Sequence, residues 1–264
     1  DLHDGTDGVR FALPWHIDVE QRTVSLQESQ PIDGIVTAVL PDGSNPWPIS
    51  RDLGLMLGRL LAEHGCQNIL EIGAGSSSLV SATALAELNG GRITSLEQDV
   101  DWCKEIWARV EAVGPQVDVE LVPVKPELRW SELGLHYQFS VSEVLKRRGP
   151  FDLVVVDAPQ YWFGRGGALP AVRAHLAPGA LLVLDDAGRK GERWALYRWL
   201  RTYPGLDLLA YDEDFGGRGV ALLKWNEPLP PRRSVLGTAS SITDRAYSAV
   251  RRQAVKLGVI KQRD

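Results

Sequence analysis

Apolar and polar positions along the chain follow two different periods, which predict strands and helices in turn. Nearly continuous apolar runs are typical of strands buried on both faces of a parallel sheet, and they fall at residues 68–72, 91–97, 117–124, 152–156 and 180–184. Between these runs apolar residues recur every three or four positions, which predicts helices at residues 50–65, 76–88, 100–113 and 190–202. The alternation predicts a doubly wound α/β fold.

The end of the pattern predicts how the sheet closes. Residues 206–211 and 219–225 form two more apolar runs, joined by the glycine-containing turn 212–218. They predict a hairpin, so we expect a mostly parallel, seven-stranded sheet with an antiparallel last strand. In the helix 100–113, we expect Trp102, Ile106, Val110 and Val113 to share one face.

Two stretches have a weaker pattern. Residues 1–49 are acidic and irregular, with short alternating pieces such as Ile35 to Leu40. Residues 125–149 read as a loop and a short helix, and they contain Trp130, His136 and Tyr137. His136 is either a catalytic base near a pocket or merely polar surface.

The most informative stretch runs from Asn68 to Ser78, where a buried strand passes through a glycine turn into a helix start. Gly73 and Gly75 let the backbone turn tightly beneath a ligand. Ser76, Ser77 and Ser78 offer cap hydroxyls and free N–H groups. Glu71 has no packing reason to lie in an apolar strand. This is the usual position of a nucleotide-bearing small molecule.

The next strand ends at Glu97, about 20 residues beyond the glycine turn, where an acid can accept hydrogen bonds from both hydroxyls of a ribose. The alternative is that Glu97 and Asp99 form a cap and solvated loop before the helix at Val100. A dinucleotide-binding site typically has a third glycine at the position that Ser78 occupies here. Its absence argues against NAD as the ligand.

These motifs together resemble the class I S-adenosylmethionine (SAM) dependent methyltransferases. The resemblance covers residues 50–227 and rests on four features: Leu70 to Gly75, Glu97, the strand and turn Phe151 to Pro159, and the closing hairpin from Tyr211 to Trp225. It implies that SAM is the cofactor, held by Glu71, Gly73, Gly75, Ser76, Ser77, Ser78, Glu97 and Asp157.

The resemblance also divides the chain. We expect an N-terminal segment, 1–49, then a catalytic domain, 50–227, and a basic helical extension, 228–264. In related enzymes the segment before the core often lies over the active site, so Trp15, His16 and Trp47 would line an acceptor pocket. The alternative is a tail packed on the surface.

Three acids follow two neighbouring strands of the predicted sheet. Asp157 follows one strand, and Asp185 and Asp186 follow the next, so all three should meet at the carboxyl edge. They could hold Mg²⁺, and metal-dependent O-methyltransferases place acids similarly, although here Asp157 is followed by Ala-Pro without a second acid or a lysine. Without a metal, Asp157 or His136 is the candidate base.

Each of these acids also has a structural alternative. Asp186 could cap the helix 190–202, with Asp185 as a solvated neighbour. Asp157 could bond the amino-acid end of SAM or nearby N–H groups.

Composition narrows the class of partner. With 264 residues, 44% hydrophobic, the chain can bury a full core, and the formal net charge of −5 disfavours a nucleic-acid partner. No run approaches about 18 apolar residues, which argues against a membrane span. Cys66 and Cys103 are too few for a disulfide framework or zinc cluster, which favours a reducing cytoplasm.

The basic segment 228–264 contains an amphipathic stretch from Ser241 to Leu257. It would pack on the core, pair with a second subunit in a homo-oligomer, or make peripheral contact with an anionic partner or membrane surface.

We therefore expect a SAM-dependent methyltransferase acting on a hydroxyl of a small molecule or saccharide, with or without Mg²⁺. The alternatives are an aminopropyl transferase on the same fold and a non-catalytic SAM-binding assembly module.

Overall fold

A computed structural model of the chain describes residues 26, 30–40, 49–160, 163–226, 229–232 and 253. Trp15, His16 and Trp47 lie outside the described residues, as does nearly all of the basic segment 228–264. The acceptor-pocket role of the first segment and the role of the last one therefore stay predictions, as do the domain boundaries.

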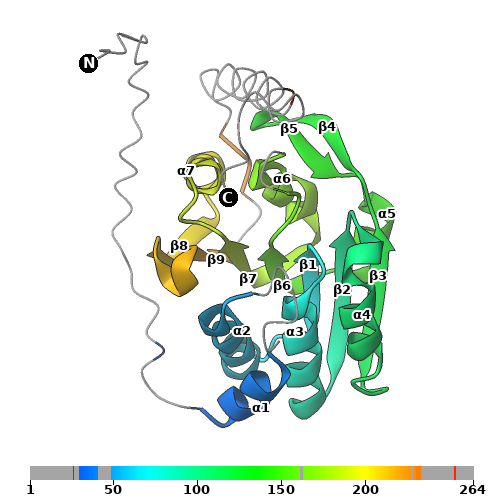
Figure 1. The fold of residues 1–264 in the computed structure, drawn as a ribbon. Coiled ribbons are helices and arrows are strands. Elements are labelled where there is room, and N and C mark those ends of the chain that lie inside the picture. Colours follow the sequence, from blue (N-terminus) through cyan, green and yellow to red (C-terminus); the bar gives the residue numbers. More distant parts are fainter. Residues whose placement is uncertain are drawn as a thin grey trace, which may run out of the picture.

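The core is one seven-stranded sheet in the order β3-β2-β1-β6-β7-β9-β8 (Figure 1). The strands are β1 (Asn68–Ile72), β2 (Gly91–Glu97), β3 (Val117–Pro123), β6 (Phe151–Val156), β7 (Leu176–Asp185), β8 (Leu206–Asp212) and β9 (Val220–Trp225). The first five are parallel, and β9 pairs antiparallel with both β7 and β8. The predicted fold class is confirmed.

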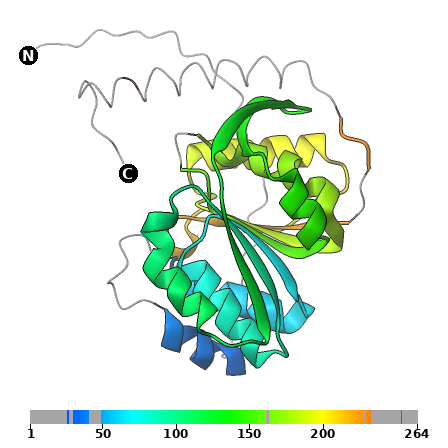
Figure 2. The same cartoon turned by 90° about the vertical axis from the view of Figure 1, so that its right-hand side faces the viewer.

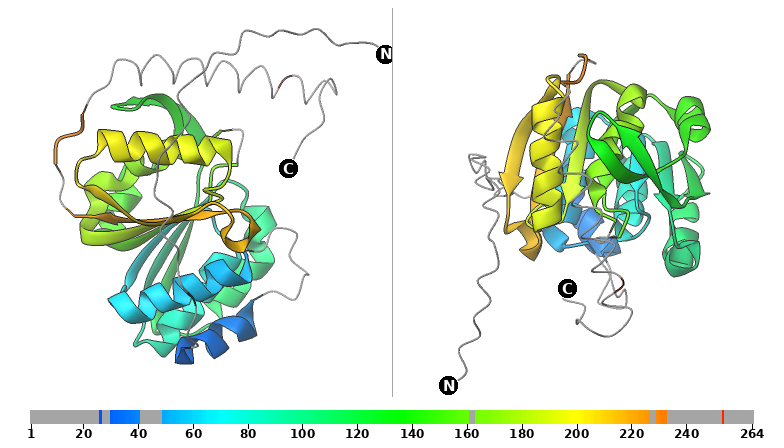
Figure 3. Two further views of the ribbon diagram at one scale, coloured as in Figure 1. Left: turned by 90° about the vertical axis from the view of Figure 1, so that its left-hand side faces the viewer. Right: turned by 90° about the horizontal axis from the view of Figure 1, so that it is seen from above.

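Helices cover both faces of the sheet (Figures 2 and 3). The helices are α1 (Pro31–Val39), α2 (Arg51–His64), α3 (Ser76–Glu87), α4 (Val100–Glu111), α5 (Ser142–Arg148), α6 (Ala168–Val172) and α7 (Lys190–Thr202). Side chains of α1 to α4 share a core with Leu153 and Val155 of β6, whereas those of α5 to α7 pack with Val154 and Val156. Alternate residues of one strand thus supply both cores, because successive strand side chains point to opposite faces.

Local signals explain the ends of the second helix. The Ser50 hydroxyl accepts the N–H of Leu53, and Gly65 closes the helix in the left-handed conformation with φ 64°. The carboxylate of Asp33 in α1 pairs with Arg59 of α2 at 2.6 Å. This ion pair ties α1 to the rest of the domain. The alternation of Ile35 to Leu40 indicated a strand, and this indication was wrong. Residues 31–39 are helical and bury Ile32 and Val36 against α2.

Two further expectations need correction. The buried face of α4 consists of Cys103, Trp107 and Val110, while Trp102 is exposed. Both sets fit a helical repeat, and the sequence pattern alone does not choose between them.

The second correction concerns residues 125–149. They hold a separate hairpin, β4 (Pro126–Ser131) and β5 (Gly134–Phe139), before the short helix α5. The hairpin tip is anchored on the body, since Tyr203 donates its hydroxyl to Glu132 at 2.6 Å and Arg173 bonds the same carboxylate. Among the described residues, no helix is long and apolar enough to cross a membrane.

Candidate functional site

The glycine turn forms where β1 ends at the carboxyl edge of the sheet. Gly73 has φ +108°, and its N–H donates to the carbonyl of Leu96 at 2.8 Å. A Cβ on Gly73 would lie 3.1 Å from the Cβ of Ala158, which follows β6. Both the backbone conformation and the close approach of this neighbour therefore require glycine.

The turn is held from below by a buried carboxylate. Glu71 is fully buried and accepts hydrogen bonds on Oε2 from the hydroxyls of Ser78, at 2.5 Å, and Ser95, at 2.7 Å. Ser78 in turn accepts the N–H of Gly75 at 3.1 Å. Glu71 thus positions the turn from beneath, and its direct contact with a cofactor stays a prediction.

The serine hydroxyls of the α3 N-terminus are used within the protein. The Ser76 hydroxyl accepts the N–H of Ile49 at 2.9 Å, and Ser78 bonds Glu71. Ser77 is also buried. An α-helix cannot pair its first N–H groups internally, and such N–H groups suit an anionic or polar ligand.

Glu97 lies beside the same turn. One carboxylate oxygen accepts the N–H of Ala74 at 2.9 Å, and the other accepts the N–H of Asp99 at 2.7 Å. Burial raises the pKa of Glu97, although these backbone bonds oppose the shift. Each carboxylate oxygen has two lone pairs, so the carboxylate keeps acceptor capacity beyond these two bonds.

Trp102, which the sequence pattern placed on one face of a helix with Ile106, Val110 and Val113, is a neighbour of the turn. Its ring lies so close to Gly75 that a Cβ there would be 3.4 Å from the ring. The exposed indole therefore forms a wall next to the glycine turn, five residues after Glu97 in the chain. Asp99 caps α4 by accepting the N–H of Trp102.

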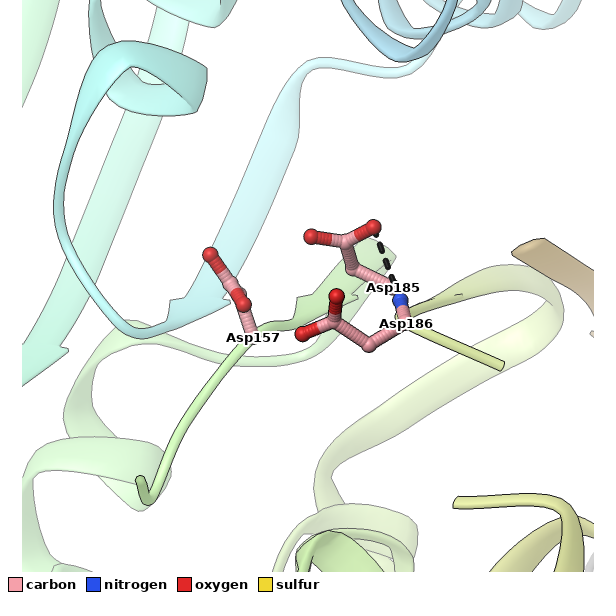
Figure 4. Close-up of side chains that lie close together, drawn as sticks. All are labelled: Asp157, Asp185 and Asp186. Atoms are coloured by element: carbon pink, nitrogen blue, oxygen red, sulfur yellow. Dashed lines mark hydrogen bonds between the residues drawn. The ribbon is translucent and has the colours of Figure 1, made fainter. Parts of the chain in front are cut away.

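The three predicted acids do come together. Asp157 follows β6, Asp185 ends β7 and Asp186 comes next, with φ +57°. One oxygen from each carboxylate lies within 4.8 Å of those from the other two. Figure 4 shows the side chains of Asp157, Asp185 and Asp186 gathered at the ends of the two neighbouring strands.

Arg165 lies in this cluster and was missed from sequence. Its Nη2 donates to Asp157 Oδ1 at 2.8 Å and to Asp186 Oδ2 at 2.5 Å, and its Nη1 donates to the main-chain oxygen of Asp185 at 2.5 Å. The side chain is only 4% exposed. Although burial opposes its charge, the carboxylates of Asp157, Glu192 and Asp186 raise the pKa of the Arg165 guanidinium.

The acids differ in their access to solvent. The Asp157 side chain is 37% exposed, whereas that of Asp186 is 3% exposed. Burial, helped by the nearby charge of Asp157, raises the pKa of Asp185 to about 7, while Arg165 opposes the rise. Asp186 does not cap α7, because the cap residue is Arg189, and Asp185 is buried rather than solvated.

His136 lies on β5 and is buried, so the interpretation as polar surface was wrong. A Cβ on Gly167 would lie 2.8 Å from its Cδ2 atom, which places the imidazole beside the short 3₁₀ turn η1 (Arg165–Gly167). A catalytic role for His136 stays a prediction.

A comparison with protein families matches residues 70–187 to the model of a methyltransferase domain. The matched segment contains the glycine turn, Glu97, Asp157, Arg165 and both acids after β7. Residues 70–187 are a methyltransferase domain. The sheet order of this domain agrees with the class I methyltransferases that the sequence motifs resemble.

Solved structures with a fold similar to this chain include cofactor-bound Rv0187 from MTB, at 22% identity and a TM-score of 0.49, covering 77% of this chain and 93% of that one. The O-methyltransferase from Bacillus cereus in complex with SAH is 19% identical, with a TM-score of 0.48, covering 76% and 93%. TomG from Streptomyces achromogenes, an O-methyltransferase in complex with SAM, is 18% identical, with a TM-score of 0.49, covering 76% and 92%. A comparison with curated proteins found no match.

Proposed function

We propose that this protein is a SAM-dependent O-methyltransferase that acts on a hydroxyl of a small molecule or saccharide. The observation that carries the proposal is that the glycine turn and the acid cluster share one edge of the sheet. The N–H of Asp157 donates to the carbonyl of Ile72 at 2.8 Å, and Gly73 packs on Ala158. A donor on the turn would therefore lie beside a carboxylate that can receive a proton.

The residues around the turn fit the cofactor. The glycine backbone and the N-terminus of α3 suit the polar amino-acid end, and the remaining lone pairs of Glu97 suit two ribose hydroxyls. The ring of Trp102 offers an apolar surface beside Gly75. When bound, SAM supplies a methyl group on a sulfonium that is already activated for transfer.

The task left to the protein is alignment and removal of the acceptor's hydroxyl proton. Asp157 is the member of the acid cluster that solvent reaches, so an acceptor can reach it too. Arg165 bonds one of its oxygens and leaves the other to face the acceptor. We assign Asp157 as the base, with His136 as the alternative.

A divalent cation is the competing way to activate the acceptor. Asp157, Asp185 and Asp186 bring three carboxylates within reach of one ion, and Asp186 Oδ1 is buried without a described hydrogen-bond partner. Mg²⁺ held there would orient a hydroxyl and lower its pKa. Against this, two of the three carboxylates already accept hydrogen bonds from Arg165.

The proposal also covers the cellular compartment of the protein and its partners. Cys66 and Cys103 are free and buried, and burial raises the pKa of the Cys66 thiol to about 12, which fits unreactive cysteines in a reducing cytoplasm. Homo-oligomer formation and peripheral contact through the basic segment 228–264 rest on residues outside the described ranges.

The experiment is a mass-spectrometric screen with SAM that carries a deuterated methyl group, using cell extract and hydroxyl compounds as acceptors. A product in which one labelled methyl replaces a hydroxyl hydrogen is the expected result. Transfer of an aminopropyl group from decarboxylated SAM would favour the aminopropyl transferase. Tight SAM binding without transfer to any acceptor would favour the assembly module.

A further inference from the structure

We propose that the Arg165 side chain takes the place of a divalent cation among the three carboxylates, so that this site works without a metal. The inference rests on the proposed function only for its activity measurement. The metal-binding measurements below test it independently.

The guanidinium contacts all three residues of the predicted metal site. Nη2 bridges the side chains of Asp157 and Asp186, and Nη1 bonds the main-chain oxygen of Asp185. A small divalent cation needs several oxygen ligands in a compact shell. A guanidinium between two of those carboxylates occupies the space and supplies one of the two positive charges that a divalent ion would bring.

The turn that carries Arg165 is fixed on two sides. A Cβ on Gly167 would lie 2.0 Å from the carbonyl oxygen of Tyr137, so the hairpin strand β5 lies directly against this turn. On the other side, Trp199 of α7 donates its indole N–H to the carbonyl of Gly166 at 2.9 Å. Arg165 therefore cannot leave the cluster by a simple movement of its backbone.

The surrounding charges also favour a permanent cation. Glu192, a buried acid next to the cluster, places a carboxylate oxygen 4.0 Å from Arg165 Nε. Arg189 bonds Asp186 at 2.8 Å from a more exposed position. Buried carboxylates need a paired charge, and Arg165 supplies it from the middle of the group. By bonding one oxygen of Asp157, it also sets the direction of the other, which makes it a positioning residue.

The test measures Mn²⁺ binding by electron paramagnetic resonance on the full chain. We expect no stoichiometric binding to the wild-type protein and one bound Mn²⁺ per chain in a folded Arg165→Met protein, in which the carboxylates are freed and an unbranched side chain remains in the turn. Arg189→Met is the matched control, because it removes a charge next to Asp186 but leaves the Arg165 bridge in place. It should not bind Mn²⁺.

Stoichiometric Mn²⁺ binding to the wild-type protein would overturn the inference, as would a folded Arg165→Met that binds none. If Arg165→Met does not fold, the wild-type protein still decides the question by its binding and by its turnover in EDTA. Turnover unchanged by EDTA supports the inference, and turnover lost in EDTA and restored by Mg²⁺ overturns it. If no acceptor is methylated at all, the proposed function fails while the Mn²⁺ measurements keep their meaning.

Discussion

The hydroxyl of Ser78 donates to the carboxylate of Glu71 over 2.5 Å, which joins the first turn of α3 to the middle of β1. Ser78 also accepts the N–H of Gly75. The side chains beneath the glycine turn are thus used to hold its shape. Its upper side is left as backbone, and this arrangement suits close approach of a ligand.

Replacing Gly73 by alanine should damage this turn. The residue has φ +108°, and an added Cβ would lie 3.1 Å from Ala158. We expect a loss of about 1–3 kcal/mol in the free energy of unfolding together with weaker SAM binding. Urea unfolding and calorimetry measure the two effects.

Gly179→Ala is the control for this prediction. Gly179 also has positive φ, +83°, but an added Cβ would meet only Lys224 Cε, at 3.9 Å. It should cost about 1 kcal/mol from backbone strain and leave SAM binding unchanged. Equal effects of both substitutions on SAM affinity would show that the turn is not the binding site.

Glu71 should make stability depend on pH. Burial raises its pKa, although the hydroxyls of Ser78 and Ser95 oppose the rise. Below the pKa of the unfolded chain the group is protonated in both states. As the pH rises toward the higher folded pKa, the unfolded chain releases the proton first, so the folded state loses stability.

Glu71→Gln removes this titration while keeping an oxygen for the two serine hydroxyls. The free energy of unfolding of the variant, relative to wild type, should therefore increase between about pH 5 and about pH 8. Chemical denaturation at both pH values measures it. A difference that does not change with pH would mean that Glu71 has the same proton affinity in both states.

Asp157→Asn tests the proposed base. The amide keeps the size of the side chain and can still accept from Arg165, but it cannot take a proton. Turnover should fall by roughly 10²–10⁴-fold while SAM affinity is kept. Asp207→Asn, an exposed change on β8, should leave both unchanged.

Other results of the Asp157 experiment reassign the residue. Lost SAM affinity would place Asp157 at the amino-acid end of the donor. Full turnover in Asp157→Asn, combined with lost turnover in His136→Asn, would move the base to β5.

The strands could be predicted closely because parallel strands buried on both faces have a nearly continuous apolar sequence. The boundaries of β1 and the position of Glu97 at the end of β2 follow from this pattern. The hairpin β4–β5 could not be predicted in the same way. It lies outside the main sheet, and its first strand exposes Leu128 and Trp130, so alternation there does not report one buried face.

The candidate site was predicted only in part. The acids were found because each follows a strand, whereas Arg165 lies in a glycine-containing turn between elements, where no periodicity applies. One signal was available: three acids predicted at one edge need a counter-charge, and Arg165 follows Asp157 closely in the chain. Trp102 was predicted to share one face with apolar residues of α4 because its spacing fits a helical stripe, but its ring lies against Gly75.

The central claim is that SAM binds on the glycine turn with its ribose on Glu97, and calorimetric titration of SAM tests it most directly. The wild-type protein should bind SAM, and Glu97→Ala should weaken binding by roughly tenfold to a hundredfold, because two hydrogen bonds to a charged group are lost. Asp101→Ala, an exposed change at the start of α4, serves as the control and should bind SAM as the wild type does. Unchanged SAM affinity in a folded Glu97→Ala protein, or no SAM binding by the wild type, would contradict the account.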